Sequence, residues 1–170
     1  MKKIALFQKV SPEQFEKDWR DTFKSFPGER IQEIYDNIKL PQRATSGSAG
    51  YDFYTPVSFK LDPNETIKIP TGIRVRINDG WVLSCYPRSG LGFKYRMQLN
   101  NTVGIIDSDY YFSENEGHIM IKFTNASNNG LTIELAEGAA FAQGIFTEYG
   151  ITIDDEASAV RNGGFGSTDQ

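Results

Sequence analysis

The fold class is decided by residues 73–86, which read IRVRINDGWVLSCY. Over residues 73–77 isoleucine or valine alternates with arginine, and this is the period of a β-strand with one buried face. The triplet Asn78-Asp79-Gly80 predicts a hairpin turn. Residues 81–86 then predict the strand that returns from it.

The same alternation recurs later in the chain. Apolar and polar residues alternate over residues 119–123 (IMIKF) and over residues 131–135 (LTIEL), with a turn at Asn128-Asn129-Gly130 between them. Many short strands separated by Gly, Asn and Pro turns indicate an antiparallel sandwich, barrel or jelly roll. We assign this mainly β domain to residues 40–160.

Residues 1–39 follow a helical period instead. The segment Ser11-Pro12-Glu13-Gln14 predicts a helix start, with serine as the N-cap and proline at the first helical position. Pro27-Gly28 ends this helix, and residues 29–37 predict a second one. The positions that share one face of each helix are Phe15, Trp19, Thr22 and Phe23, and Ile31, Ile34, Tyr35 and Ile38. We expect a helical appendage docked on the β domain.

Composition and charge exclude several classes of function. A net charge of -4 and a pI near 5.1 argue against a protein that coats nucleic acid, because such binding neutralises many phosphates. No apolar run is long enough to span a membrane. The single cysteine, Cys85, excludes an intrachain disulfide framework. We therefore expect no nucleic-acid partner, no membrane and a cytoplasmic location.

Two residue types that often carry chemistry have ordinary explanations here. His118 is the single histidine, so no histidine-based metal site can form, and we expect it to be half-exposed at the start of a strand. Cys85 lies inside an apolar strand, which predicts an inert buried thiol. No Gly-rich segment fits a P-loop or a dinucleotide-binding fingerprint.

Four segments suit a nucleotide, although each has a plainer explanation. Residues 48–52 end in a carboxylate that an Asx turn would explain. Residues 87–96 carry three positive charges beside glycines, which suits phosphate binding or an exposed basic loop. Residues 101–110 predict a buried apolar strand that ends at Asp107, where the carboxylate can deprotonate water or cap a turn. Residues 161–170, RNGGFGSTDQ, suit phosphate and base contacts or form a flexible tail.

In order and spacing these segments resemble the five motifs of the trimeric dUTPase family. The motifs are placed at residues 49–53 (AGYDF), 87–90 (PRSG), 101–110 (NTVGIIDSDY), 138–143 (GAAFAQ) and 161–168 (RNGGFGST). Five ordered motifs make chance agreement remote. The resemblance implies a dUTPase-like β-clip jelly roll. It extends to the variants of Gram-positive bacteria and their phages, through the long 110–117 connection and the short fifth motif.

The resemblance also implies a role for each motif. Asp107 is the expected general base that activates the attacking water, and Tyr110 is expected to lie on the deoxyribose and exclude a 2′-hydroxyl. The residues expected to read the uracil edge are Asn101, Gly104, Ile105, Ile106 and Met120. The residues expected to hold phosphates are Arg88, Ser89, Gly90 and Gln143. The fifth motif is expected to add Arg161, Gly166, Ser167 and Thr168, with Phe165 stacked on uracil.

The implied reaction is hydrolysis of dUTP to dUMP and pyrophosphate, which keeps uracil out of DNA and supplies dUMP for dTMP synthesis. The implied cofactor is Mg²⁺, held mainly by the substrate phosphates, with Asp52 acting on it through water. The implied assembly is a homotrimer with sites shared between subunits. Residues 161–170 would be a mobile arm that closes over the substrate.

The sequence departs from the family pattern in three places, and two alternative functions stay open. The 111–116 connection is longer than usual, Ala140 stands where many members have arginine, and the fifth motif is one residue shorter before Phe165. A dCTP deaminase shares the fold, but it needs a glutamate on the strand after the third motif, and residues 118–123 hold none. A regulatory protein partner, contacting the helices and the long connection, would be a second function.

Overall fold

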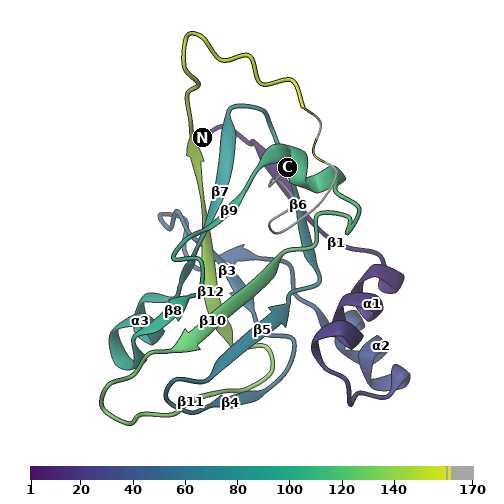
Figure 1. The fold of residues 1–170 in the computed structure, drawn as a ribbon, viewed down its shortest axis with the longest axis vertical. Coiled ribbons are helices and arrows are strands. Elements are labelled where there is room, and N and C mark those ends of the chain that lie inside the picture. The colour runs from purple at the N-terminus through teal and green to yellow at the C-terminus, as the bar shows by residue number, and fades with distance from the viewer. Residues whose placement is uncertain (160, 162–170) are drawn as a thin grey trace.

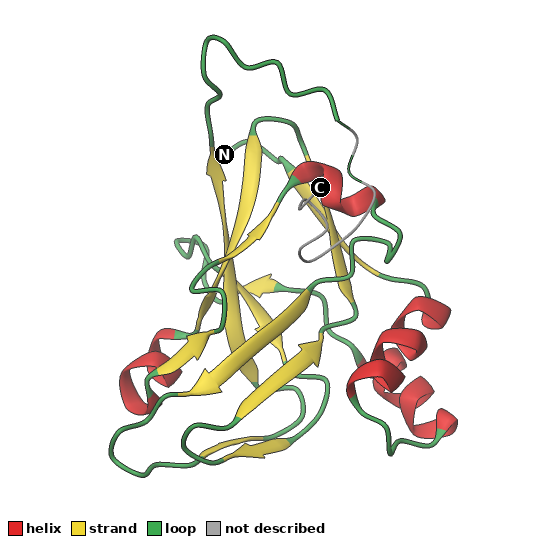
Figure 2. Cartoon of the chain, viewed as in Figure 1, coloured by secondary structure: helices red, strands yellow, loops and turns green. Residues whose placement is uncertain are grey.

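The computed structural model describes residues 1–159 and 161, and antiparallel strands dominate it (Figure 1, Figure 2). Two helices, α1 (Pro12–Thr22) and α2 (Gly28–Asn37), lie together on one side of the strands. A short helix, α3 (Ser89–Tyr95), lies on the opposite side, and a 3-10 helix, η1 (Ser108–Phe112), lies apart from all three. The mainly β fold class with short N-terminal helices is confirmed.

The strands that the structure describes form four antiparallel sheets. The largest contains, in spatial order, β2 (Gln42–Arg43), β3 (Tyr51–Tyr54), β12 (Ala140–Glu148), β7 (Trp81–Pro87) and β9 (Gly104–Ile106). A three-stranded sheet contains β5 (Thr66–Pro70), β10 (Met120–Asn125) and β8 (Met97–Leu99). The two remaining pairs are β1 (Ala5–Lys9) with β6 (Ile73–Ile77), and β11 (Ile133–Leu135) with β4 (Phe59–Leu61).

The hairpin predicted at residues 78–80 is only half right. The turn exists, because the N–H of Trp81 donates to the C=O of Asn78 at 3.3 Å and Gly80 has a φ of 79°. The flanking strands do not pair with each other, since β6 pairs with β1 while β7 pairs with β12 and β9. The sequence did not reveal β1, and β1 supplies the backbone partners that β6 would otherwise have needed from β7.

The main core lies between the sheets. Along β10 the pattern is the predicted one, because Ile121 and Phe123 are buried while Lys122 between them is exposed. Along β7 three successive residues, 83–85, are all buried, so both faces of this central strand are covered. Each large apolar side chain buried in this way stabilises the fold by roughly 1.5–3 kcal/mol.

The two N-terminal helices form a smaller second core. Ser11 caps α1 as predicted, and its hydroxyl accepts from the backbone N–H of Gln14 at 3.1 Å. Phe23 and Ile38 contact both cores, which docks the helices on the β domain. The fully buried residues of the second core are Val10, Phe15, Trp19, Ile31 and Ile34. No helix in the described part of the chain is long and apolar enough to cross a membrane.

Candidate active site

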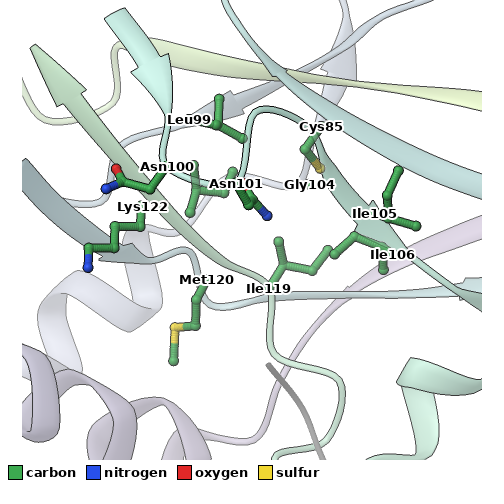
Figure 3. A pocket seen from close by; sticks show the side chains of 11 residues that line it. Cys85, Leu99, Asn100, Asn101, Gly104, Ile105, Ile106, Ile119, Met120 and Lys122 are labelled. Carbon is green, nitrogen blue, oxygen red and sulfur yellow. The ribbon is translucent and has the colours of Figure 1, made fainter. Parts of the chain in front are cut away.

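A cavity of about 270 Å³ lies between the end of β8, strand β9 and the start of β10 (Figure 3). Its lining includes all five residues predicted to read uracil, which are Asn101, Gly104, Ile105, Ile106 and Met120. Strand β9 lies at the edge of its sheet, so one row of its backbone N–H and C=O groups has no neighbouring strand. A planar base with donors and acceptors on its edge fits such a slot.

The close approach of β9 to β7 shapes this cavity. Gly104 is the register partner of Cys85, and a Cβ at residue 104 would lie 3.2 Å from the Cβ of Cys85. Burial raises the pKa of the Cys85 thiol to about 12, so the thiol stays protonated. The predicted burial of this thiol is confirmed.

Asp107 directly follows the strand that lines the cavity. It is the residue before η1, and its C=O accepts from the N–H of Tyr110 at 3.2 Å. The Asp107 side chain is 46% exposed, so water reaches the carboxylate. The expectation that this strand is buried was wrong for Ile105, which is 55% exposed because its side chain points to the opposite face of β9 from the buried residues 104 and 106.

Tyr110 is held firmly on η1. It is 4% exposed, and its hydroxyl donates to the C=O of His118 at 2.8 Å. The side-chain amide of Asn115 donates to the same hydroxyl at 2.9 Å. Burial raises the pKa of the Tyr110 hydroxyl, so this group remains a neutral hydrogen-bond donor.

His118 is not the half-exposed residue that the sequence led us to expect. Its side chain is fully buried, Nε2 accepts from the N–H of Gly72 at 2.7 Å, and Nδ1 lies 2.6 Å from Oδ2 of Asp18. Because Nε2 accepts, the hydrogen bond to Asp18 assigns the ring hydrogen to Nδ1. The sequence could not reveal this contact, since its two partners come from distant segments.

Arg161 lies beside two carboxylates that follow strand β9. Its Nη2 donates to Oδ2 of Asp107 at 2.5 Å, and its Nε donates to Oδ1 of Asp109 at 3.0 Å. Arg161 was predicted to bind the substrate phosphates. In the described structure its guanidinium instead pairs with the carboxylates of Asp107 and Asp109. Phe165, Gly166, Ser167 and Thr168 lie outside the described residues.

The predicted phosphate residues form a second group. Arg88, Ser89 and Gln143 line a shallow cavity of about 560 Å³, and Asp52 is the register partner of Gln143. Nη1 of Arg88 lies 3.4 Å from Oδ2 of Asp52, and the side-chain amide of Gln143 donates to the C=O of Pro87 at 3.3 Å.

Two expectations at this second group need correction. An exposed loop was one of two readings of the basic segment, and most of this segment is helix α3, which begins directly after Arg88 and includes Gly90. The Asx turn considered for Asp52 is absent, because Asp52 lies within strand β3.

The two groups do not meet in one chain. Helix α3 and η1 lie at opposite sides of the molecule (Figure 1). Asp107 directly follows the predicted uracil-reading residues of β9, and Tyr110 lies on η1, whereas Ser89 and Gly90 belong to α3 on the other side of the molecule.

Sequence patterns alone missed several residues at the cavity. Leu99, Asn100, Ile119, Ile121 and Lys122 also line it. The alternation over residues 119–123 placed the side chains of Ile119, Ile121 and Lys122 on two faces of a strand. It did not predict that the start of β10 lies opposite β9. Asp109 was likewise not expected to hold Arg161.

Comparison with known proteins places the chain in a family. The family model described as dUTPase matches residues 36–169. The chain belongs to the dUTPase family. The deoxyuridine 5′-triphosphate nucleotidohydrolase of Lactococcus lactis is 38% identical over 134 residues, which cover 77% of this chain and 88% of that protein. Its counterpart in Tolumonas auensis is 38% identical over 141 residues, covering 79% and 90%.

Solved structures agree on the fold. The crystal structure of the Streptococcus mutans dUTPase superimposes with a TM-score of 0.61 at 28% identity, covering 88% of this chain and 98% of that one. The dUTPase from phage phi11 of S. aureus superimposes with a TM-score of 0.62 at 19% identity, covering 92% and 97%. Residues 1–35 lie outside the match to the family model.

Proposed function

We propose that this dUTPase-family chain hydrolyses dUTP to dUMP and pyrophosphate. One observation carries the proposal: the edge strand β9 lines a cavity of about 270 Å³ and runs directly into Asp107, whose carboxylate water can reach. A base held against this strand edge would fix its attached sugar and phosphates relative to one carboxylate. The names of the relatives at 38% identity support the same reaction.

Asp107 is the proposed general base. A carboxylate that is 46% exposed can accept a proton from a water molecule while it stays hydrogen-bonded to solvent. Tyr110 follows one turn of η1 later, and its hydroxyl is held by the C=O of His118. The guanidinium of Arg161 lies 5.9 Å from the centre of the Tyr110 ring, so the deoxyribose would rest on this ring where Arg161 moves away. An added 2′-hydroxyl would then have to displace a side chain that is 4% exposed.

Uracil recognition is assigned to the backbone of residues 104–106, with Asn101 and Met120 beside it. Strand-edge N–H and C=O groups have fixed directions, so cytosine would present a donor where uracil presents an acceptor. The strand that follows, residues 118–123, holds no glutamate, which disfavours deamination.

Phosphate binding is assigned to Arg88, Ser89, Gly90 and Gln143. A guanidinium can form two parallel hydrogen bonds to a phosphate, and the hydroxyl and amide add further donors. Because this group lies across the molecule from Asp107, we infer that a site combines residues of neighbouring subunits in a homotrimer. Phe93, which is 92% exposed on α3 beside this group, suits burial at such a contact.

Mg²⁺ is the proposed cofactor, since the dUTPase family generally uses it. Within the described residues no three His, Cys, Asp or Glu side chains converge, so substrate phosphates would supply most of the oxygen ligands. Asp52 beside Arg88 is the acidic side chain that fits a water-mediated contact to such an ion. When bound, the ion neutralises phosphate charge and polarises the phosphorus.

Arg161, Phe165, Gly166, Ser167 and Thr168 are proposed to close over the bound nucleotide. The guanidinium of Arg161 suits phosphate, and an aromatic ring suits the face of uracil. The regulatory protein partner stays a prediction, because none of the described contacts bears on it.

The test is a substrate panel. The protein would be incubated with each deoxynucleoside triphosphate, and with UTP, in the presence of Mg²⁺, while pyrophosphate is measured. Pyrophosphate release from dUTP alone, abolished by a chelator, is the expected result. Equal release from dCTP, or ammonia release from dCTP, would contradict the proposal.

A further inference from the structure

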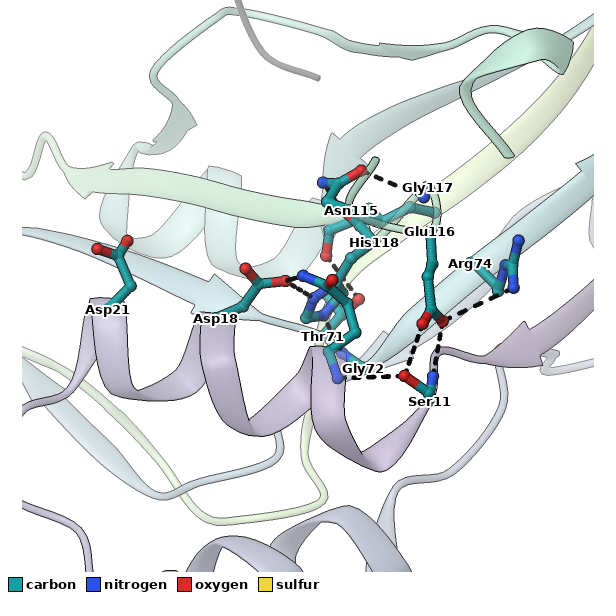
Figure 4. Close-up of polar contacts among 12 residues, drawn as sticks. Ser11, Asp18, Asp21, Thr71, Gly72, Arg74, Asn115, Glu116, Gly117 and His118 are labelled. Carbon is teal, nitrogen blue, oxygen red and sulfur yellow. Dashed lines mark hydrogen bonds and ion pairs between the residues drawn. The ribbon is translucent and has the colours of Figure 1, made fainter. Parts of the chain in front are cut away.

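The N-terminal appendage (residues 1–39) is tied to the segment that carries Asp107 and Tyr110. Three residue pairs connect residues 1–39 with residues 107–118 through polar contacts, from strand β1, from the start of α1 and from the middle of α1. Figure 4 shows the two contacts made by α1. The family model begins only at residue 36, so most of this appendage lies outside the common part of the family.

The first tie joins Asp18 of α1 to His118. Oδ2 of Asp18 lies 2.6 Å from Nδ1 of His118, whose ring is fully buried and whose Nε2 accepts from the N–H of Gly72. The same carboxylate oxygen accepts from Gln14 at 2.7 Å. A carboxylate fixed from two sides thus fixes the ring, and the ring fixes the backbone of residue 118.

The backbone of His118 in turn holds the side chain of Tyr110. The Tyr110 hydroxyl donates to the C=O of His118 at 2.8 Å, and Asn115 bridges to this hydroxyl. The N–H of Tyr110 donates to the C=O of Asp107. An unbroken chain of hydrogen bonds and backbone therefore runs from α1 to the two proposed reaction-site residues.

The second tie joins the start of α1 to Glu116. The carboxylate of Glu116 accepts from the N–H of Ser11 at 2.8 Å and from the Ser11 hydroxyl at 2.6 Å. Glu116 has a φ of 58°, so the loop turns sharply at this residue to reach the helix. Nη1 of Arg74 lies 3.8 Å from the same carboxylate.

The third tie joins β1 to Tyr111. The Tyr111 hydroxyl donates to Oε1 of Gln8 at 2.7 Å, and the guanidinium of Arg74 lies 3.7 Å from the centre of the Tyr111 ring. Nη2 of Arg74 also donates to the C=O of Tyr111 at 2.7 Å. Residues 110, 111, 116 and 118 are thus all held, directly or through one neighbour, by the appendage and β6.

We propose that the N-terminal appendage is a positioning element of the active site, in which Asp18, acting through His118, fixes the Tyr110 ring and the turn that presents Asp107. The inference rests on the proposed function, because Tyr110 is taken to lie against the sugar. The long 111–116 connection then has a structural role, because it reaches from η1 to the N-terminal appendage and contacts it. A positioning residue should govern selectivity for the sugar rather than only stability.

The experiment compares four proteins: wild type, Asp18→Ala, Asp18→Asn and Asp21→Ala. Asp18→Ala removes the acceptor of His118, whereas Asp18→Asn keeps an acceptor oxygen at the same place. Asp21 lies on the same helix, is 75% exposed and pairs with Lys68 at 3.1 Å, so Asp21→Ala is the matched control (Figure 4). For each protein kcat and KM are measured with dUTP and with UTP, beside the melting temperature.

The expected result is a fall of about tenfold in the selectivity for dUTP over UTP in Asp18→Ala, because a displacement of about 1 Å at a fitted surface is costly. Asp18→Asn should recover most of that selectivity, and Asp21→Ala should match wild type. Unchanged selectivity in a folded, active Asp18→Ala protein would overturn the inference. If wild type itself fails to hydrolyse dUTP, the proposed function fails instead, and this outcome is separate.

A second variant covers the case in which Asp18→Ala does not fold. Glu116→Asn shortens the side chain beyond reach of Ser11, and asparagine tolerates the positive φ at residue 116. It cuts the second tie without replacing a residue of α1 or His118. Selectivity should fall in the same direction but by less, and an unchanged value would again contradict the inference.

Discussion

Arg161 and Asp107 form an ion pair in which Nη2 donates to Oδ2 at 2.5 Å, and Asp109 accepts from Nε of the same guanidinium at 3.0 Å. The negative charge of Asp107, the proposed general base, is partly neutralised in this contact. The phosphates of a bound nucleotide are a stronger attraction for a guanidinium. We infer that substrate would draw Arg161 away and free Asp107 to accept a proton from water.

The role of Asp107 as the base can be tested by Asp107→Asn. The amide cannot take a proton from water, so kcat should fall about a hundredfold or more while the melting temperature stays near that of wild type. Asp109→Asn removes a neighbouring carboxylate that also holds Arg161, and the kcat of this variant should fall far less. Turnover of Asp107→Asn close to wild type would rule out Asp107 as the base.

Removal of residues 161–170 tests the proposed arm. The deletion removes only one ion-paired group from the described structure, so the melting temperature should change little. Turnover should fall severely, and Arg161→Ala should reproduce part of the loss through one missing phosphate contact. The arm would be structural if the deletion unfolded the protein, and it would be irrelevant to catalysis if turnover were unaffected.

The separation of Arg88 from Asp107 predicts an obligatory assembly. Light scattering should give the mass of a trimer, and Arg88→Ala mixed with Asp107→Asn should regain activity through sites that receive both intact residues. Each variant alone should have low activity. A fully active monomer, or a mixture no more active than its parts, would be incompatible with shared sites.

The contact of Glu116 with Ser11 predicts a dependence of stability on acid. Burial alone would raise the pKa of Glu116, but hydrogen bonds from Ser11 and the charge of Arg74 outweigh it, so the pKa lies below its usual value. A lowered pKa contributes stability that is fully present above the unfolded value of about 4.3 and is lost as pH falls through the folded value. In Glu116→Gln the free energy of unfolding should therefore change less between pH 6 and pH 3 than in wild type, as urea titrations would reveal.

Two glycines with similar backbone angles should respond differently to alanine. Gly72 has a φ of 71°, and a Cβ there would overlap Cδ1 of Ile38. Gly80 has a φ of 79° and nothing within 4 Å of a built Cβ. Gly80→Ala should cost about 1–2 kcal/mol for the backbone alone, and Gly72→Ala about 1–3 kcal/mol more for the clash. Equal losses in the free energy of unfolding would show that the Ile38 side chain moves aside to accommodate the added Cβ.

Local patterns determined much of this protein. The alternation over residues 119–123 fixed strand β10, and Ser11 followed by Pro12 fixed the start of α1. These features are readable because each depends on neighbours a few residues away, through strand or helix periodicity and capping. The order and spacing of the five motifs along the chain likewise indicated the family without any knowledge of which strands pair.

Tertiary structure alone decided what those elements meet. Asp18 and His118 are 100 residues apart in the chain, and Ser11 and Glu116 are 105 apart, so no local period encodes either contact. The same holds for β6, whose partner is β1 and not the strand beyond the turn. Burial of a polar side chain such as His118 depends on a partner that satisfies it, and only the folded chain brings that partner into reach.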